Sequence, residues 1–220
     1  MNSSSGFLQV LQTVDAFFPI GAFTLSNGLE SYVTEEWIQT PADLQEYIEG
    51  FLYAFPYQDL GLLQLSYTHA GEQAYIKELD QTAAAMKTPQ EVRQGSFRMG
   101  KRMAKALEKM GGQPAFLSWY REGCHPIVLG LYGQACGIPV QQLLEMYGYS
   151  VLSAIVNNAV KLVPLSQLEG QRVLHESLPL LEKAVEQAMA IDIDELGISA
   201  AANDIHCMRH EKLYSRQYMS

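Results

Sequence analysis

Apolar residues recur along most of the chain with the spacing of α-helices. The clearest segment opens at Thr40, where a helix N-cap is followed by Pro41 at the first helical position and Asp43 in the first turn. This helix is expected to continue to about Phe55. Its apolar positions follow the i, i+3, i+4, i+7, i+8 pattern of a face that packs on a core: Leu44, Tyr47, Ile48, Phe51 and Leu52.

The same signals predict further helices downstream. Two are expected over residues 58–70 and 72–86. Thr88 and Glu91 have the spacing of a capping box, in which each residue bonds the other's backbone N–H, so a helix should begin there and end at Gly111–Gly112. Another capping box, Ser166 with Glu169, opens a helix to about Ile191. An acidic loop over residues 192–199 and a last helix from about Ala200 follow.

Residues 140–163 form the most apolar segment of the chain. Glu145 and Lys161 are its only charges, and Pro164 ends it. We therefore predict a central helix that is covered on most sides. With few strand signals, no internal repeat and no linker, residues 1–220 are expected to form a single all-α domain, a bundle of roughly nine to eleven helices.

Composition supports a folded protein outside the membrane. Of 220 residues, 48% are hydrophobic and 18% are charged, which excludes a bias toward disorder. No apolar run reaches the roughly 18 residues of a membrane span. The N-terminus lacks the basic region of a signal peptide, and three cysteines give no disulfide framework, so we expect a cytoplasmic protein.

Charge is distributed unevenly. Residues 1–76 contain nine acidic side chains and no lysine or arginine, so this part carries the whole net charge of −9. It is either a solvated acidic face or a docking surface that attracts a complementary partner. Nucleic acid is not expected as a partner, because phosphate binding requires a basic excess.

One segment nearly matches a phosphate-binding loop. Residues 95–101 supply the glycines and the lysine, but Arg102 stands where a hydroxyl must reach the magnesium ion, and the segment lies in a predicted helix. Nucleotide binding is not expected. Helical spacing instead gives a basic stripe, which is either a solvated face or a surface for an acidic partner: Arg98, Lys101, Arg102, Lys105 and Lys109.

Other candidate chemistry is weak. His206 and His210 share a helical face at a spacing that can hold a transition metal, but no third ligand follows and Cys207 points elsewhere. Cys124 lies beside His125 without an orienting partner, and the pair Glu35-Glu36 lies in the acidic surface. We expect no enzyme and no cofactor.

Two segments are more informative. The loop from Asp15 to Phe23 carries four large apolar side chains around a Pro-Ile-Gly turn, and is either part of the core or an exposed binding patch. The C-terminal tail, residues 209–220, carries tyrosines and arginines, which are enriched at interface hot spots. Few core contacts are expected at a terminus.

Five segments in register resemble the urease accessory protein F family (UreF). They are Phe18-Pro19-Ile20-Gly21 with Phe23, Ser26 and Gly28-Leu29-Glu30; Glu91, Arg93, Ser96 and Gly100; His125-Pro126 with Gly130; Asn158 to Gln171; and Met208 to Glu211 with Tyr214 and Arg216.

The resemblance implies an all-α scaffold or chaperone without catalytic activity. It implies a homodimer that binds UreD (also called UreH), recruits the GTPase UreG and acts with it on apo-urease, so that nickel is inserted. Two alternatives remain: a nickel carrier using His206, Cys207 and His210, and an activator of the partner GTPase.

The positions that match the family's motifs give candidate residues for partner contacts and for a polar path. Partner contacts are expected at the tail residues His210, Glu211, Tyr214 and Arg216. A second, conformationally sensitive surface is expected at Pro19, Phe23, Ser26 and Glu30. Lys161, with Asn157 beside it, is expected to line a polar path or to anchor an internal ion pair.

Overall fold

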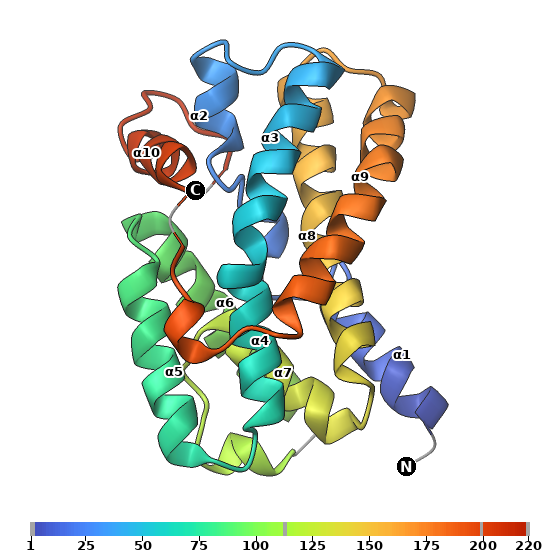
Figure 1. The fold of residues 1–220 in the computed structure, drawn as a ribbon, viewed down its shortest axis with the longest axis vertical. Helices are drawn as coiled ribbons and strands as arrows, with labels where there is room; N and C mark the ends of the chain where they lie inside the picture. Colours follow the sequence, from blue (N-terminus) through green and yellow to red (C-terminus); the bar gives the residue numbers. More distant parts are fainter. Residues whose placement is uncertain (1–2, 112–113, 199, 219–220) are drawn as a thin grey trace.

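The computed structural model describes residues 3–111, 114–198 and 200–218. Gly112, Ser199, Met219 and Ser220, which belong to the predicted helix stop, acidic loop and tail, lie outside these residues. The described chain folds into ten α-helices and four short 3-10 helices, and contains no strand, which confirms the all-α prediction (Figure 1). The α-helices are α1 (Ser3–Val14), α2 (Leu29–Thr34), α3 (Pro41–Ala54), α4 (Asp59–Thr68), α5 (Gln73–Met86), α6 (Gln90–Lys109), α7 (His125–Cys136), α8 (Val140–Leu162), α9 (Gln167–Ala188) and α10 (Ala201–His210).

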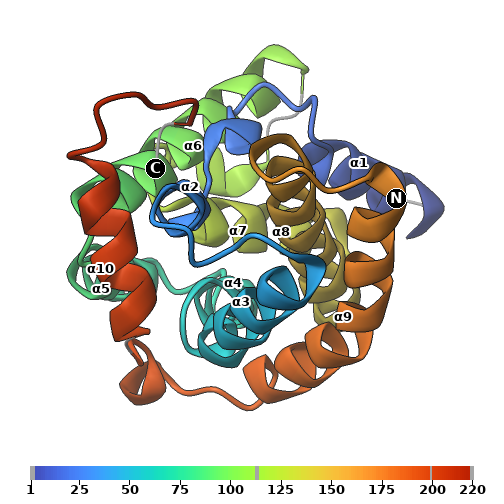
Figure 2. The same cartoon turned by 90° about the horizontal axis from the view of Figure 1, so that it is seen from above.

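Helices α4 and α7 form the centre of the bundle, and the other helices surround them (Figure 2). Nine consecutive residues of α7, from His125 to Gly133, are buried. Two glycines permit this packing, because a Cβ at Gly130 would lie 2.1 Å from Ser66 Oγ and one at Gly133 would lie 2.4 Å from Leu143 Cδ2. Residues 140–163 were predicted to form a central helix covered on most sides. Helix α8 buries nine residues and exposes one side, including Glu145, Tyr149 and Lys161, so it is less completely buried than α7.

Two of the three predicted N-caps form, each of them as a capping box. Thr40 with Asp43 caps α3, and Ser166 with Glu169 caps α9. The third, Thr88 with Glu91, was wrong, since α6 begins after Pro89 without a side-chain cap. Both side chains serve tertiary contacts instead: the Thr88 hydroxyl donates to Asp204 at 2.9 Å, and Glu91 accepts from the C-terminal region.

The other predicted elements agree within a few residues. The acidic loop after α9 contains a 3-10 helix, Ile193–Glu195, and Gly111 adopts a positive φ of 82° just after α6. Among the described residues, no helix is both long enough and apolar enough to cross a membrane.

Candidate functional site

The first and the last of the segments that resemble the UreF family, which contain Glu30 and His210, meet where α2 and α10 pack together. Helix α2 begins after Gly28, whose φ of 84° suits glycine and whose missing side chain leaves room for α10. A Cβ at Gly28 would lie 2.9 Å from Cys207 Sγ. This close approach places Glu30, in the first turn of α2, against the end of α10.

His210 is buried completely between two carboxylates. Its Nδ1 lies 2.7 Å from Glu91 Oε2, and its Nε2 lies 2.9 Å from Glu30 Oε2. A doubly protonated ring can donate to both carboxylates at once, whereas a neutral ring can donate to only one. Residue 210 therefore joins α10 to both α2 and α6.

The segment after α10 returns to the same carboxylates. Arg216 donates to Glu91 Oε1 at 2.6 Å, and the backbone N–H groups of Gln217 and Tyr218 donate to Glu30 at 2.7 Å and 3.1 Å. We call Glu30, Glu91, His210 and Arg216, with these two N–H groups, the tail clamp. The described part of the tail contributes no residue to the apolar core, as expected, but these polar bonds fasten it to α2 and α6.

The clamp changes the interpretation of several predicted partner contacts. His210 and Glu30 are buried and hold the tail, and Ser26 is buried too, so these three do not face a partner in this conformation. Tyr214 and Glu211 are exposed, and the Tyr214 side chain extends freely from the turn between His210 and Arg216.

A second carboxylate supports α10 beside the clamp. Glu35 accepts a hydrogen bond from Arg209 at 2.7 Å and lies 3.4 Å from His206 Nε2. The His206 ring stacks on Tyr32 with centroids 3.6 Å apart. The sequence could not reveal these contacts, because they join residues more than 170 positions apart.

The weak metal candidates do not converge on one point. His206 faces Glu35, whereas His210 faces Glu30 and Glu91. Burial raises the pKa of the Cys207 thiol to about 12, which disfavours the thiolate that binds metals. In the described parts of the chain, no three histidine, cysteine or acidic side chains are placed to hold a metal ion.

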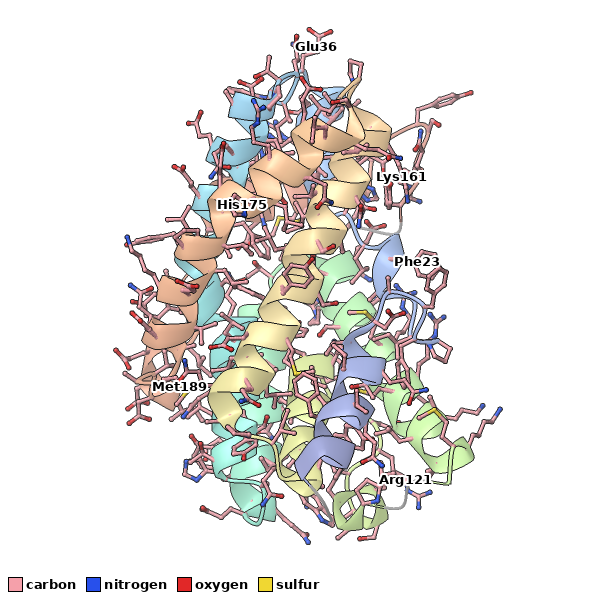
Figure 3. All side chains as sticks on the ribbon, turned by 90° about the vertical axis from the view of Figure 1, so that its right-hand side faces the viewer. Phe23, Glu36, Arg121, Lys161, His175 and Met189 are labelled. Atoms are coloured by element: carbon pink, nitrogen blue, oxygen red, sulfur yellow. The ribbon has the colours of Figure 1, made fainter. Side chains whose placement is uncertain are left out.

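The apolar loop is divided between core and surface. Phe18 and Ile20 are buried, whereas Phe17 is 95% exposed and Phe23 is 57% exposed. Figure 3 shows Phe23 projecting outward on the side of the molecule where α1 lies. Pro19 is exposed as well. Both alternatives left open by the sequence are therefore realised within one loop.

Lys161 and Asn157 lie on the wall of a cavity of about 740 Å³ that extends from α8 toward α10. Both side chains are exposed, so the alternative of an internal ion pair at Lys161 was wrong. The lysine on this cavity that does form a buried ion pair is Lys87, which pairs with Asp59. The Tyr147 hydroxyl also donates to Asp59 Oδ2 at 2.9 Å.

The remaining candidates are the near-match to a phosphate-binding loop, the basic stripe, and Cys124 with His125. Residues 95–102 lie within α6, as expected, and the five cations of the basic stripe are exposed. Cys124 is buried, and burial raises the pKa of its thiol to about 12, which makes it a poor nucleophile. Burial also lowers the pKa of neighbouring His125 to about 4.

Fold and site thus define a helical protein whose charged groups fasten its own tail. Comparison with known proteins gives the family. The UreF family model matches residues 38–178. The urease accessory protein UreF of Actinobacillus pleuropneumoniae serotype 3 (strain JL03) is 35% identical, covering 96% of this chain and 97% of that protein.

Two further relatives agree. UreF of Haemophilus influenzae (strain PittGG) is 34% identical over 96% of this chain and 94% of that protein. UreF of Streptococcus salivarius (strain 57.I) is 29% identical over 99% of this chain and 96% of that protein. The chain belongs to the UreF family of urease accessory proteins.

Proposed function

We propose that this protein is a homodimeric, non-catalytic scaffold of the cytoplasm that binds UreD (UreH) and recruits the GTPase UreG, so that nickel is inserted into apo-urease. Family membership supports the link to urease. The tail supports the mode of action, because the clamp holds the segment 211–218 against α2 and α6 while leaving Tyr214 fully exposed. An aromatic side chain on a fixed turn can contact a partner with little loss of conformational entropy.

The observation that carries the proposal is this pairing of a buried anchor with an exposed tyrosine. His210 and Arg216 hold the two ends of the turn, and Tyr214 lies between them. Arg216 is engaged by Glu91, so it stabilises the presenting surface and is not a free arginine. Tyr214 and Glu211 are the direct partner contacts in this proposal, and Pro19 and Phe23 belong to a second surface.

The test is co-purification with UreD and UreG, using the full chain and Tyr214→Ala. We expect the full chain to capture both, and Tyr214→Ala to weaken capture about tenfold or more, a typical hot-spot loss. Deletion of residues 209–220 is a poor variant because it removes His210. Deletion from Tyr214 onward retains that anchor.

The matched control is Tyr53→Ala, which removes another exposed tyrosine from α3. It should capture both partners normally. Unchanged thermal unfolding of Tyr214→Ala would show that the effect lies in binding, and light scattering should give twice the 24.5 kDa of one chain. A full chain that captures neither UreD nor UreG would overturn the proposal.

A further inference from the structure

An apolar groove lies between α1, the following loop and the end of α6. Its volume is about 500 Å³, and its apolar lining is Leu8, Leu11, Phe17, Phe18, Pro19 and Met110. Phe17 and Leu8 are 95% and 63% exposed, so much of this apolar surface is in contact with solvent. Contiguous exposed apolar surface of this kind marks sites of association.

The basic stripe of α6 borders this groove. Arg102 donates to the backbone carbonyl of Ile20 at 3.1 Å, which turns its face of α6 toward the loop. Lys105 and Lys109 follow at i+3 and i+7 on that face, and Met110 then enters the groove. The last cation of the stripe, Lys109, is therefore adjacent in sequence to Met110, which lines the groove.

Part of the charge on α6 is neutralised within the chain, including one cation of the stripe. Lys101 pairs with Glu122, and Glu108 pairs with Arg121 at 3.2 Å. Across the described residues, by contrast, no ion pair involves Arg98, Lys105 or Lys109. Unneutralised cations beside an apolar groove can steer and orient an acidic partner.

We propose that the groove and the basic stripe together form a docking surface for an acidic amphipathic segment of another protein. Apolar side chains of that segment fill the groove beside Phe17, and its carboxylates lie along Arg98, Lys105 and Lys109. The surface is separate from the tail clamp and Tyr214. The proposal rests on the proposed function, because its test uses the proteins of urease maturation.

Two other occupants fit less well. In a two-fold dimer the surface would face itself, which would place the cations of one copy against those of the other. An anionic membrane attracts cations but repels a chain of net charge −9. A hollow also fits projecting side chains better than a flat lipid surface does.

The experiment measures binding of the full-length protein to UreD, UreG and apo-urease, each immobilised separately. The variants are Lys105→Glu/Lys109→Glu and Phe17→Ser. Their matched controls are Lys77→Glu/Lys183→Glu, which reverses two exposed lysines on α5 and α9, and Tyr53→Ser. All six substituted residues are exposed, and circular dichroism should show folded protein for all four variants.

For one of the three partners, we expect the double reversal to weaken affinity about thirtyfold and Phe17→Ser about tenfold, with no change in the controls. Wild-type binding to that partner should weaken with added salt, and the reversal should reduce this salt dependence.

Equal capture of all partners by the wild type and the variants would overturn the docking surface while leaving the proposed function intact. A wild type that captures none of them would overturn both. Loss of dimer mass in Phe17→Ser, or binding to phosphatidylserine vesicles that the reversal abolishes, would assign the surface to a second copy or to a membrane and would also overturn the inference.

Discussion

Two buried ionic centres differ in what they hold together. The pair Lys87–Asp59 joins the start of α4 to the segment after α5, with Tyr147 of α8 completing the carboxylate's hydrogen bonds. The tail clamp joins α2 and α6 to the last described residues. The first centre fastens helices that the apolar core already holds, whereas the second fastens a segment with little apolar support. We therefore expect the first to control global stability and the second to control the tail.

The largest effect is expected at the first centre. Lys87→Ala leaves Asp59 mostly buried without its cation, which costs about 3–5 kcal/mol for a broken buried pair. Urea unfolding followed by circular dichroism measures this change. Lys77→Ala, an exposed lysine on α5, is the control and should change stability by less than about 0.5 kcal/mol. Similar values for both variants would contradict a role for the pair in global stability.

The tail clamp should respond differently to loss of its histidine. His210→Ala leaves two carboxylates facing each other, but release of the tail lets them reach water, which limits the cost to about 2–3 kcal/mol. Hydrogen exchange should show the amides of residues 211–218 losing protection while those of α4 and α7 keep theirs. Equal loss of protection across the bundle would show that the clamp is part of the core. His175→Ala, on the exposed face of α9, is the control.

Acidification should lower the stability of the fold through His125, whose buried ring lies beside the first centre, its centroid 5.8 Å from that of the Tyr147 ring. Because burial lowers its pKa to about 4, the unfolded chain, with the ordinary pKa of 6.5, binds a proton that the folded chain does not. Stability from this group is therefore complete above about pH 6.5 and declines as pH falls toward 4. The loss between pH 7 and pH 5 is roughly 2 kcal/mol. His125→Leu should remove this contribution, and an identical pH profile in both proteins would exclude it.

The smallest effect is expected at the outer part of the clamp. Arg216 is partly exposed, so Arg216→Ala should cost less than about 1 kcal/mol. It should nevertheless speed proteolytic cleavage within residues 211–218, because one of the two anchors is lost. Arg172→Ala, another exposed arginine, should leave the cleavage rate unchanged. If Arg216→Ala resists protease as the wild type does, Glu30 and His210 suffice to hold the tail.

Local signals in the sequence were enough for the helices but not for the contacts among them. Proline and capping residues located the starts of α3 and α9 because those bonds form within three residues. Glu91 had the same local signal, yet its carboxylate binds His210 and Arg216, more than a hundred positions away. Hydrogen bonds to distant residues therefore replace the local capping bond that Glu91 could have formed.

The candidate site shows the same limit. Resemblance identified Glu30, His210 and Arg216 as important, but not that they bind one another. The lysine chosen for an internal ion pair, Lys161, is exposed, while Lys87 drew no attention, because burial of a lysine depends on packing that periodicity does not encode. The apolar loop was recognised from its composition. That Phe18 is buried while Phe17 is exposed could be learned only from the fold.

The tail clamp also bears on the order in which this protein is made. Glu30 is synthesised well before the groups that satisfy it, because His210 and the N–H groups of Gln217 and Tyr218 follow it by 180 residues or more. Until then a carboxylate destined for the interior has no partner, and α2 has no α10 to pack against. The surface around Tyr214 can therefore form only after residues 210–218 have been made, and a chain cut short before residue 210 lacks the groups that hold it in place.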